Sequence, residues 1–470
     1  MALRFLFVFF LLFILSCEQG QRSNKSTINF VIIFLDDAGY GDFEPFGMPK
    51  YKTPEVARLA KEGCRFDRFY VPQAVCSASR AALMSGCFPG TTGVFAAHGP
   101  GQSGLPTKFP TMAEVLKEKG YTTGFFGKWH LGDVKGQRPH ERGFDETAGI
   151  MYSGDMWRYH PVRPKGWGNL AFWENGKITN EDVSPKDQTL FTKTFTEKAV
   201  NFIKKNKDNP FFLYVPHPMP HVPIFCSKEF EGKSGLGLYA DVILEIDWSV
   251  GQINQALKDN GVEDNTLVIF SSDNGPWTVY GDHGGTTPFR EAKATSFDGG
   301  CRSPCVIKCP KVIKAGTQSD KTFCSIDLLP TIAKLAGIDD TNLNVDGKDM
   351  IDLIVDAPHF KNSHEYYPQT IGKNFQAIIS GDGKWKLHIP HKYKSLNGQD
   401  PSATKEYITH MGYKIRKPTV SQVMLKIEYA LFNMELDPLE KNNVIDKFPK
   451  VAEKMKALAD FHKKKYFTKK

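Results

Sequence analysis

From about residue 28, short apolar runs alternate with amphipathic stretches. Runs of four to eight β-branched, aliphatic and aromatic residues predict buried strands. Apolar residues at helical spacing predict helices between these runs, with Thr189 as a candidate N-cap of the third helix. The strands are expected over 28–35, 122–126, 211–215 and 267–271, and the helices over 53–61, 111–118, 191–205 and 239–257. This alternation is typical of an α/β fold with a large, mostly parallel mixed sheet flanked by helices.

The pattern changes after residue 338. Short strands separated by turns are expected over 377–388 and 429–434, followed by a helix over 450–462. Short strands with one closing helix are typical of a small sheet covered on one face. We therefore predict a catalytic domain over 27–338 and a smaller C-terminal α+β subdomain over 339–470.

The first residues have the pattern of a targeting segment. Arg4 precedes an apolar run over 5–15, which is shorter than the ~20 residues that a bilayer-spanning helix needs. Residues 1–17 are therefore predicted to be a signal peptide, and the protein to be exported, either periplasmic or secreted. The run ends in Leu15-Ser16-Cys17, which resembles a bacterial lipoprotein signal, so lipidation of Cys17 and simple cleavage both stay open. A lipid anchor is the one membrane attachment expected.

Composition and charge limit the kinds of partner. The chain has 470 residues, of which 41% are hydrophobic, enough for a large core. Its net charge of +8 arises from 60 basic and 52 acidic residues, and much of the excess lies in the tail over 462–470. The charge suits an anionic substrate but does not establish one. No zinc-finger, basic-zipper or RNA-binding motif is present, so no nucleic-acid partner is expected.

Nine cysteines raise the question of disulfides and metal clusters. In an exported protein one or two disulfides can form, and the connectivity cannot be deduced from the sequence. Cys301, Cys305 and Cys309 are evenly spaced, but no His or fourth Cys accompanies them at a usual metal-site spacing. Buried thiols or a disulfide explain these three residues better than a metal cluster does.

Two groups of polar residues follow predicted strands. Asp36 and Asp37 come directly after the first strand, and Asp273 and Asn274 follow the strand over 267–271. Ligands of open α/β sheets bind at the carboxyl ends of the strands. Three carboxylates and one amide are hard oxygen donors, which suit Ca²⁺ or Mg²⁺ rather than zinc.

A third group surrounds Cys76. It begins a helix-like run, with Arg80 one turn further on. A helix N-terminus favours an anion, and an arginine adds a cation to the same place. An isolated cysteine in this position is usually inert, so its chemistry depends on the rest of the sequence.

The chain resembles the type I, formylglycine-dependent sulfatases, and is arylsulfatase-like. The resemblance covers nearly the whole mature chain, because several signatures occur in the family's order. In chain order they are the runs 36–41 (DDAGYG), 76–80 (CSASR), 127–132 (GKWHLG), 220–223 (PHVP), 272–275 (SDNG) and 282–285 (DHGG), then Lys293, and then the runs 298–300 (DGG), 385–387 (WKL) and 436–440 (LDPLE). The resemblance implies an alkaline-phosphatase-like fold and a bacterial polysaccharide sulfatase.

The resemblance also implies a role for each residue. Cys76 is converted to formylglycine (3-oxoalanine), whose hydrate attacks sulfur and displaces the alcohol; elimination of sulfate then restores the aldehyde. A calcium ion, or Mg²⁺, is held by Asp36, Asp37, Asp273, Asn274 and residue 76. Arg80, Lys128 and Lys293 steady the hydrate and the sulfate oxygens, while His130 accepts a proton and His221, with Lys293, protonates the leaving alcohol. Lys128, His221 and Lys293 are thus the expected substrate-binding residues.

Two residues depart from the family pattern. Ala78 stands where the family usually has Pro, and an anaerobic bacterial formylglycine-generating maturase tolerates Ala there. Such a maturase is therefore the expected partner. Cys87 stands where Arg often supports the modified residue, which puts the tuning of the aldehyde in question.

Substrate and alternative activities are less constrained. A sulfated carbohydrate is expected, such as ulvan, carrageenan, fucoidan or a glycosaminoglycan. The stretch over 151–173 is rich in aromatic and basic residues, and either lines the substrate cleft or packs as an ordinary loop. Two other functions stay open at this point: a phosphodiesterase or phosphonate hydrolase of the same superfamily, and a catalytically silent protein that binds sulfated glycans.

Overall fold

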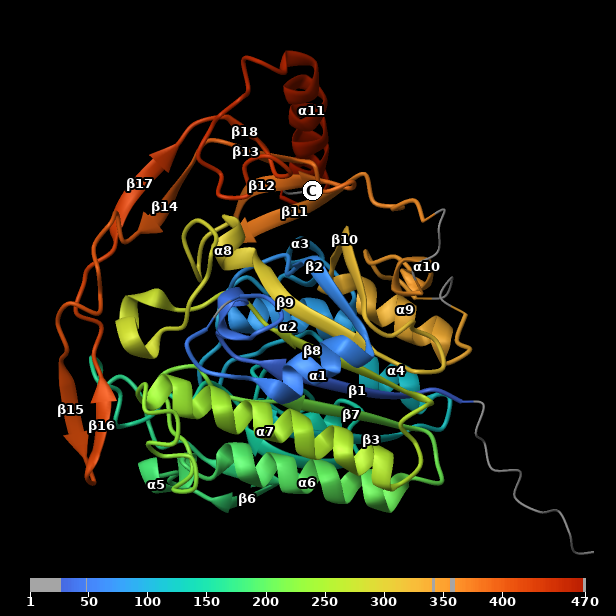
Figure 1. Cartoon of the computed structure of the whole chain (residues 1–470), viewed down its shortest axis with the longest axis vertical. Helices are drawn as coiled ribbons and strands as arrows, with labels where there is room; N and C mark the ends of the chain where they lie inside the picture. Colours follow the sequence, from blue (N-terminus) through green and yellow to red (C-terminus); the bar gives the residue numbers. More distant parts are fainter. Residues whose placement is uncertain (1–26, 48, 340–342, 356–359, 468–470) are drawn as a thin grey trace, which may run out of the picture.

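A large mixed sheet forms the centre of the molecule (Figure 1). The computed structural model describes residues 27–47, 49–339, 343–355 and 360–467, so the predicted signal peptide and Cys17 lie outside it. The sheet has ten strands in the order β10-β2-β9-β8-β1-β7-β3-β4-β5-β6. Neighbours from β8 to β4 are parallel, whereas β9, β5 and β6 pair antiparallel. The predicted large, mostly parallel mixed sheet is confirmed.

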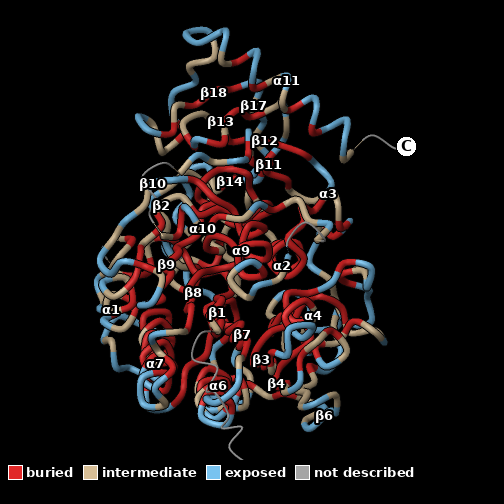
Figure 2. Tube along the Cα trace, turned by 90° about the vertical axis from the view of Figure 1, so that its right-hand side faces the viewer, coloured by how far each residue is buried: buried red, intermediate tan, exposed pale blue. Residues whose placement is uncertain are grey.

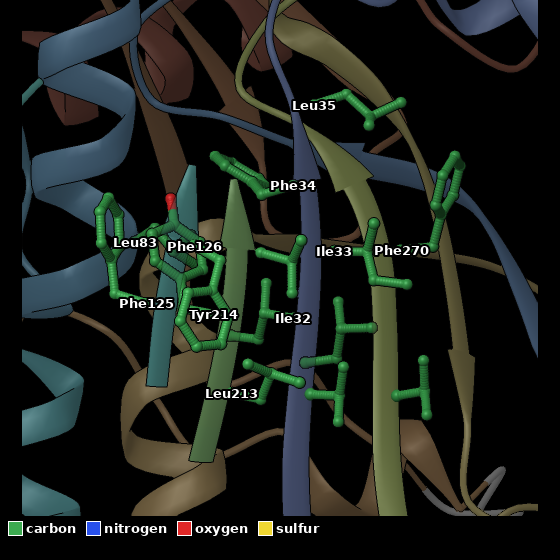
Figure 3. Packing of buried hydrophobic residues seen from close by; sticks show 14 of the residues in the cluster. Ile32, Ile33, Phe34, Leu35, Leu83, Phe125, Phe126, Leu213, Tyr214 and Phe270 are labelled. Atoms are coloured by element: carbon green, nitrogen blue, oxygen red, sulfur yellow. The ribbon is translucent and has the colours of Figure 1, made fainter. Parts of the chain in front are cut away.

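The strands of this sheet lie close to their predicted positions. Their bounds are β1 (Asn29–Leu35), β2 (Cys64–Tyr70), β3 (Thr122–Lys128), β4 (Glu146–Ile150), β5 (Phe172–Glu174), β6 (Lys177–Asn180), β7 (Phe211–Pro216), β8 (Thr266–Ser272), β9 (Arg302–Lys308) and β10 (Thr317–Cys324). All seven residues of β1 are buried, as a strand covered on both faces requires. Figure 3 shows Ile32, Ile33 and Phe34 packed beside Leu213 and Tyr214 of β7 and Phe270 of β8.

Helices cover both faces of the sheet (Figure 2). One group packs together as α1 (Pro54–Glu62), α6 (Phe191–Asn206) and α7 (Leu238–Asp259), and the other as α2 (Cys76–Ser85), α4 (Met112–Lys117) and α9 (Leu328–Leu335). Shorter helices are α3 (Pro89–Thr92), α5 (Pro185–Gln188), α8 (Asp298–Cys301) and α10 (Ile351–Ile354), with 3-10 turns η1 (Tyr40–Asp42), η2 (Pro139–Glu141), η3 (Thr278–His283) and η4 (Ser325–Asp327). In the described residues, no helix combines the length and the apolarity that crossing a bilayer requires.

The prediction that Thr189 caps the third helix is wrong. Ser184 and Asp187 form a capping box that starts α5 four residues earlier, and Thr189 lies at the end of α5. The Thr189 hydroxyl donates to the carbonyl of Lys186, and α6 begins after Leu190. The reciprocal capping box is the stronger helix start, because it satisfies two backbone N–H groups rather than one.

A second, smaller sheet lies at the C-terminal end of the chain (Figure 1). It is antiparallel, in the order β11-β12-β13-β18, and α11 packs on it. The bounds are β11 (Tyr366–Ile371), β12 (Asn374–Ser380), β13 (Trp385–His388), β18 (Ala430–Asn433) and α11 (Pro449–Tyr466), with two-stranded sheets of β14 (His391–Ser395) and β17 (Val423–Ile427), and of β15 (Tyr407–His410) and β16 (Tyr413–Arg416). The predicted α+β character of this region is confirmed, while the boundary at residue 338 stays a prediction.

A buried ion network joins the small sheet to the large one. Lys386 of β13 donates to Oδ1 of Asp298 at 2.8 Å and to Oε1 of Glu440 at 3.1 Å. His388 contacts the other oxygen of Glu440 at 2.6 Å, and Tyr70 of β2 donates to Asp298 at 2.9 Å. Because these charges are withdrawn from water, each needs its partners to remain ionised.

Candidate active site

The predicted site residues converge at the carboxyl ends of the parallel strands β8, β1 and β3, with β7 between β1 and β3. Asp36 and Asp37 follow β1, Lys128 ends β3, and Asp273 follows β8. Parallel strands that are neighbours in a sheet end at the same edge, which brings residues far apart in sequence together. Cys76, the first residue of α2, joins them.

Asp36 is held by cations. Lys128 Nζ donates to Asp36 Oδ2 and also to the hydroxyl of Ser153 at 2.6 Å. Arg80 Nη2 lies 3.5 Å from Asp36 Oδ1. Burial opposes ionisation of Asp36, but the nearby positive charges, Lys128 foremost, hold its pKa well below the usual value. Asp36 is therefore a carboxylate.

Asp37 has a left-handed backbone with φ of 63°, which a non-glycine residue rarely adopts. Its N–H donates to Asp273 Oδ1 at 3.1 Å, which holds this conformation. Its carboxylate accepts from Asn274 Nδ2 at 2.8 Å and from Lys293 Nζ at 2.7 Å. The turn after β1 is thus fixed by the turn after β8.

Arg80 forms a forked ion pair with Asp273. Its Nε and Nη2 lie 3.0 and 2.8 Å from Asp273 Oδ2, and its Nη1 donates to the carbonyl of Lys128 at 3.2 Å. Both side chains are fully buried. Burial raises the pKa of Asp273 to about 7, although Arg80 acts in the opposite direction. A further cation beside Asp273 would favour its carboxylate form.

Cys76 is a buried thiol beside two ammonium groups. Lys293 Nζ lies 3.4 Å from its Sγ. Burial raises the pKa of the Cys76 thiol to about 12, even though Lys128 and Lys293 act in the opposite direction. The side chain is therefore a neutral thiol at neutral pH, unlike the thiolate of a cysteine-nucleophile enzyme.

The site has the donors that a hard cation needs. Asp36, Asp37, Cys76 and His221 each offer one donor atom, and these four atoms lie within 4.8 Å of one another. Asp36 Oδ1 and Asn274 Oδ1 are buried without a hydrogen-bond partner. Buried acceptors without a donor are costly, and a cation among them would remove that cost. The residues present therefore fit a divalent cation.

Two features of the arrangement bear on the predicted ligand set, which stays a prediction. His221 lies among the candidate donor atoms, although no sequence pattern indicates it as a ligand. Asp273 is already engaged, because Oδ2 accepts from Arg80 and Oδ1 from the N–H of Asp37. Asn274 can therefore offer a cation an oxygen that accepts no hydrogen bond, whereas both oxygens of Asp273 already accept one.

The two predicted proton-transfer histidines have defined hydrogen bonds. His130 Nε2 lies 2.8 Å from the carbonyl of His98, so Nε2 carries the proton and Nδ1, which has no partner, keeps its lone pair. Burial, with a contribution from Lys128, lowers the pKa of His130 well below its usual value. His221 Nδ1 lies 2.5 Å from the carbonyl of Val222, and its Nε2 lies 3.6 Å from Asp37 Oδ2.

The structure adds residues that the sequence did not single out. Ser153 contacts Lys128, and the His98 carbonyl fixes the tautomer of His130. The Trp277 ring lies 4.4 Å from Lys293 Nζ and 5.3 Å from the ring of His221. Trp277 lies three residues after Asn274, and this closeness to a site motif was the one sequence feature that could have indicated its role.

The aromatic loop over 151–173 is partly core. Trp157 is fully buried, packs edge-on against Tyr159 and contacts Phe225, so it does not line an open cleft. The Tyr159 ring lies 3.6 Å from that of His410 in β15. The loop therefore connects the site edge, through Ser153, with a C-terminal hairpin.

The structure shows where Cys87 and the three evenly spaced cysteines, Cys301, Cys305 and Cys309, make their contacts. Cys87 Sγ hydrogen-bonds to the carbonyls of Ser85 and Asn344 rather than to a site residue. Cys301, Cys305 and Cys309 are buried thiols and form no disulfide. Within the described residues, the one candidate metal group contains none of the three.

Comparison with known proteins decides the family. A sequence model of the family described as Sulfatase matches residues 28–338. The chain belongs to the sulfatase family. Arylsulfatase A of Bos taurus is 33% identical to this sulfatase over 450 residues, covering 90% of this chain and 84% of its own.

Solved structures agree with this assignment. The structure described as Ps i-CgsB in complex with k-i-k-neocarrahexaose is 29% identical, with a TM-score of 0.73 and coverage of 91% of both chains. PsFucS1 sulfatase from Pseudoalteromonas sp. has a TM-score of 0.80 at 24% identity and covers 94% of this chain and 92% of its own, which shows the shared fold. This sulfatase is a sulfuric ester hydrolase with an alkaline-phosphatase-like fold. The phosphoester hydrolase and silent-binder alternatives are therefore set aside.

Proposed function

We propose that this sulfatase removes sulfate from sulfated carbohydrates with a formylglycine derived from Cys76, beside a bound calcium ion. The observation that carries the proposal is the position of Cys76. It begins a helix, lies 3.4 Å from Lys293 Nζ and shares a cluster of donor atoms with Asp36 and Asp37. A neutral, buried thiol is a poor nucleophile, so the position gains its chemistry through modification.

Formylglycine supplies a hydrated aldehyde whose hydroxyl is the nucleophile toward sulfur. The Ala78 position supports maturation by an anaerobic bacterial maturase. Asp36, Asp37, Asp273, Asn274 and residue 76 would hold Ca²⁺, or Mg²⁺, with His221 beside them. Such an ion would polarise a sulfate oxygen as a Lewis acid.

Three cations of the chain would bind the sulfate group. Lys128, Lys293 and Arg80 are all held in place by carboxylates of the site. Burial excludes water, and charge-assisted hydrogen bonds from fixed cations are stronger in such a place than in solvent. These groups would stabilise the negative charge that accumulates on the sulfuryl oxygens.

Two histidines would move protons. His130 is neutral, with an unpartnered Nδ1 that can accept a proton from the hydrated residue 76 when sulfate leaves. The Nδ1–H of His221 donates to the Val222 carbonyl, so the imidazolium form, which also carries a proton on Nε2, would donate that second proton to the departing alcohol. The Trp277 ring beside His221 and Lys293 would limit water access to that proton.

The choice of a carbohydrate substrate rests on the relatives and on charge. The similar structure Ps i-CgsB holds a neocarrahexaose, and this chain carries a net charge of +8. We further propose a bacterial, exported enzyme, periplasmic or secreted, whose signal peptide over 1–17 is removed either by simple cleavage or by lipoprotein processing that leaves Cys17 lipidated. An exported enzyme has access to a marine polysaccharide or a glycosaminoglycan, which is too large to enter the cytoplasm intact.

Sulfate release from Cys76→Ser tests the proposal. The variant is expressed in a host whose maturase does not oxidise serine, and is assayed on a panel of sulfated oligosaccharides and one aryl sulfate. Activity should fall to background while the protein stays folded. Cys309→Ser is the matched control, because Cys309 contacts the carbonyl of Asp264 at the opposite end of β8 from the site. Retained turnover in Cys76→Ser would overturn the proposal.

A further inference from the structure

A basic pocket lies on the C-terminal sheet, outside the site described above. Its volume is about 450 Å³, and it lies between the β11–β12 hairpin, the start of β14 and the end of α11. Figure 1 shows β11, β12 and α11 together above the large sheet. Its cationic lining residues are Lys373, Lys392 and Lys463, and no Asp or Glu lines it.

The three lysines have no acidic partner. All three are exposed, and within the described ranges none forms an ion pair with a carboxylate. Many other lysines of the chain do have one, such as Lys334 with Asp349. Three uncompensated ammonium groups around one hollow create a local positive potential, which attracts a polyanion.

The rest of the lining suits a sugar. Gln376 is 3% exposed, and its Oε1 has no hydrogen-bond partner, so its carboxamide has capacity left for a hydroxyl. Phe467 is half-buried and lines the pocket, and its ring stacks on that of the buried Phe375 at 6.0 Å with an interplanar angle of 20°. Aromatic faces pack against the apolar faces of sugar rings, and ammonium groups meet sulfate oxygens.

The pocket is joined to the active site from two directions. Thr370 of β11 hydrogen-bonds to the carbonyl of Pro72 at 3.1 Å and to Gln73 at 2.9 Å, just before Cys76 in the chain. On the other side, His391 Nε2 lies 3.5 Å from the hydroxyl of Ser296, three residues after Lys293. Both walls of the pocket are therefore fastened to the segments that carry residues of the catalytic site.

We propose that this pocket binds a second sulfated segment of the polysaccharide whose ester is hydrolysed at residue 76. The inference rests on the proposed carbohydrate substrate. A polymer held at two places is retained between cleavages, because the second contact is intramolecular and adds to the first. The pocket thus favours long, highly sulfated chains over isolated sulfated sugars.

Binding of dextran sulfate to the full chain tests the proposal. The variant K373Q/K392Q/K463Q is compared with K204Q/K207Q/K258Q, which removes three exposed lysines in or directly after α6 and α7 and makes the same change in net charge. The Kd for a short dextran sulfate, measured by calorimetry near physiological salt, should rise about 10-fold in the pocket variant, as three exposed ion pairs imply. It should stay unchanged in the control.

Comparators separate sugar recognition from bare charge. Unsulfated dextran should not bind, and poly-aspartate should bind the wild type more weakly than dextran sulfate does. An unchanged Kd in the pocket variant, an equal loss in the control, or equal affinity for poly-aspartate would overturn the proposal. Turnover of a small aryl sulfate should be the same in all three proteins. Absence of that turnover in the wild type would instead contradict the proposed function, independently of the pocket.

Discussion

The ammonium group of Lys293 lies 3.4 Å from the Sγ of Cys76. The same nitrogen lies 2.7 Å from a carboxylate oxygen of Asp37. Lys293 therefore links the residue that is modified with the residues that hold the cation. Burial opposes protonation of Lys293, but the carboxylates Asp37 and Asp36 raise its pKa and keep it protonated.

Replacing Lys293 by methionine should lower kcat/KM about 10²- to 10³-fold, because one charge that stabilises the sulfuryl oxygens is lost. Methionine keeps the length of the side chain and its contact with the Trp277 ring. Sulfate release gives the rate, and thermal unfolding shows whether the fold persists. A loss confined to KM would show that Lys293 acts in ground-state binding alone.

Removal of the divalent ion should abolish turnover and lower the Tm. Without a cation, the buried acceptors Asp36 Oδ1 and Asn274 Oδ1 have no hydrogen-bond partner among the described residues. Chelator-treated protein is assayed for sulfate release, and its metal content is measured by plasma mass spectrometry before and after calcium is restored. After the same removal and restoration of calcium, Asp37→Asn should regain neither metal nor activity. Full turnover at negligible metal content would contradict this role.

His221→Ala should affect substrates according to their leaving group. An alkoxide needs a proton as it departs, so turnover of a sugar sulfate should fall about 10²- to 10⁴-fold. An activated phenolate needs none, and its aryl sulfate should lose far less. Parallel kcat measurements on the two substrates give the comparison, and an equal loss on both would argue against a proton donor at this position.

His217 should make stability depend on pH. Burial lowers the pKa of His217 to about 4, whereas an unfolded histidine has the ordinary value of 6.5. Below pH 6.5 the unfolded chain binds the proton and the folded chain does not, so stability is lost as pH falls from 6.5 toward 4. The slope is up to about 1.4 kcal/mol per pH unit.

His217→Gln measures that dependence. Glutamine retains a hydrogen bond to the hydroxyl of Ser249, which His217 Nε2 contacts at 3.0 Å. Urea unfolding of both proteins at several pH values should show the wild type losing stability relative to the variant below pH 6.5. A constant difference between the two proteins across this range would contradict the assignment.

Glu440→Gln should destabilise the junction of the two sheets by about 3–5 kcal/mol, because it removes one charge from a buried network. Lys386 and His388 would lose their common carboxylate partner. Glu435→Gln is the matched control, since the Glu435 ion pair with Lys384 is exposed and should contribute about 1 kcal/mol or less. Urea unfolding gives both values, and equal effects would contradict the importance of burial.

Much of the fold was predictable because its central strands carry short continuous apolar runs. The run over 28–35 and the polar Asp36-Asp37 that follow it locate both a strand and a site edge. The position of Thr189 was not predictable with the same certainty, since a capping box at Ser184 competes with it. The capping box at Ser184 satisfies two backbone N–H groups and starts a short helix, α5, at whose end Thr189 lies.

The site was predictable in its membership but not in its pairings. The strand ends and the family-like motifs predict that Cys76, Asp36 and Lys293 belong to one site. The sequence does not show that Asp273 is engaged by Arg80, or that His221 lies among the metal donors, since both depend on side-chain directions across separate loops. Trp277 was missed because an aromatic residue in a loop has no spacing signal of its own.

The chemical state of residue 76 tests the central claim most directly. An active preparation is digested, and the peptide containing residue 76 is analysed by mass spectrometry while turnover is measured on the same sample. The account predicts that sulfur is exchanged for oxygen with loss of two hydrogens, and that the converted fraction rises in proportion to turnover across preparations. Full turnover by protein with an unaltered thiol at position 76 would contradict it.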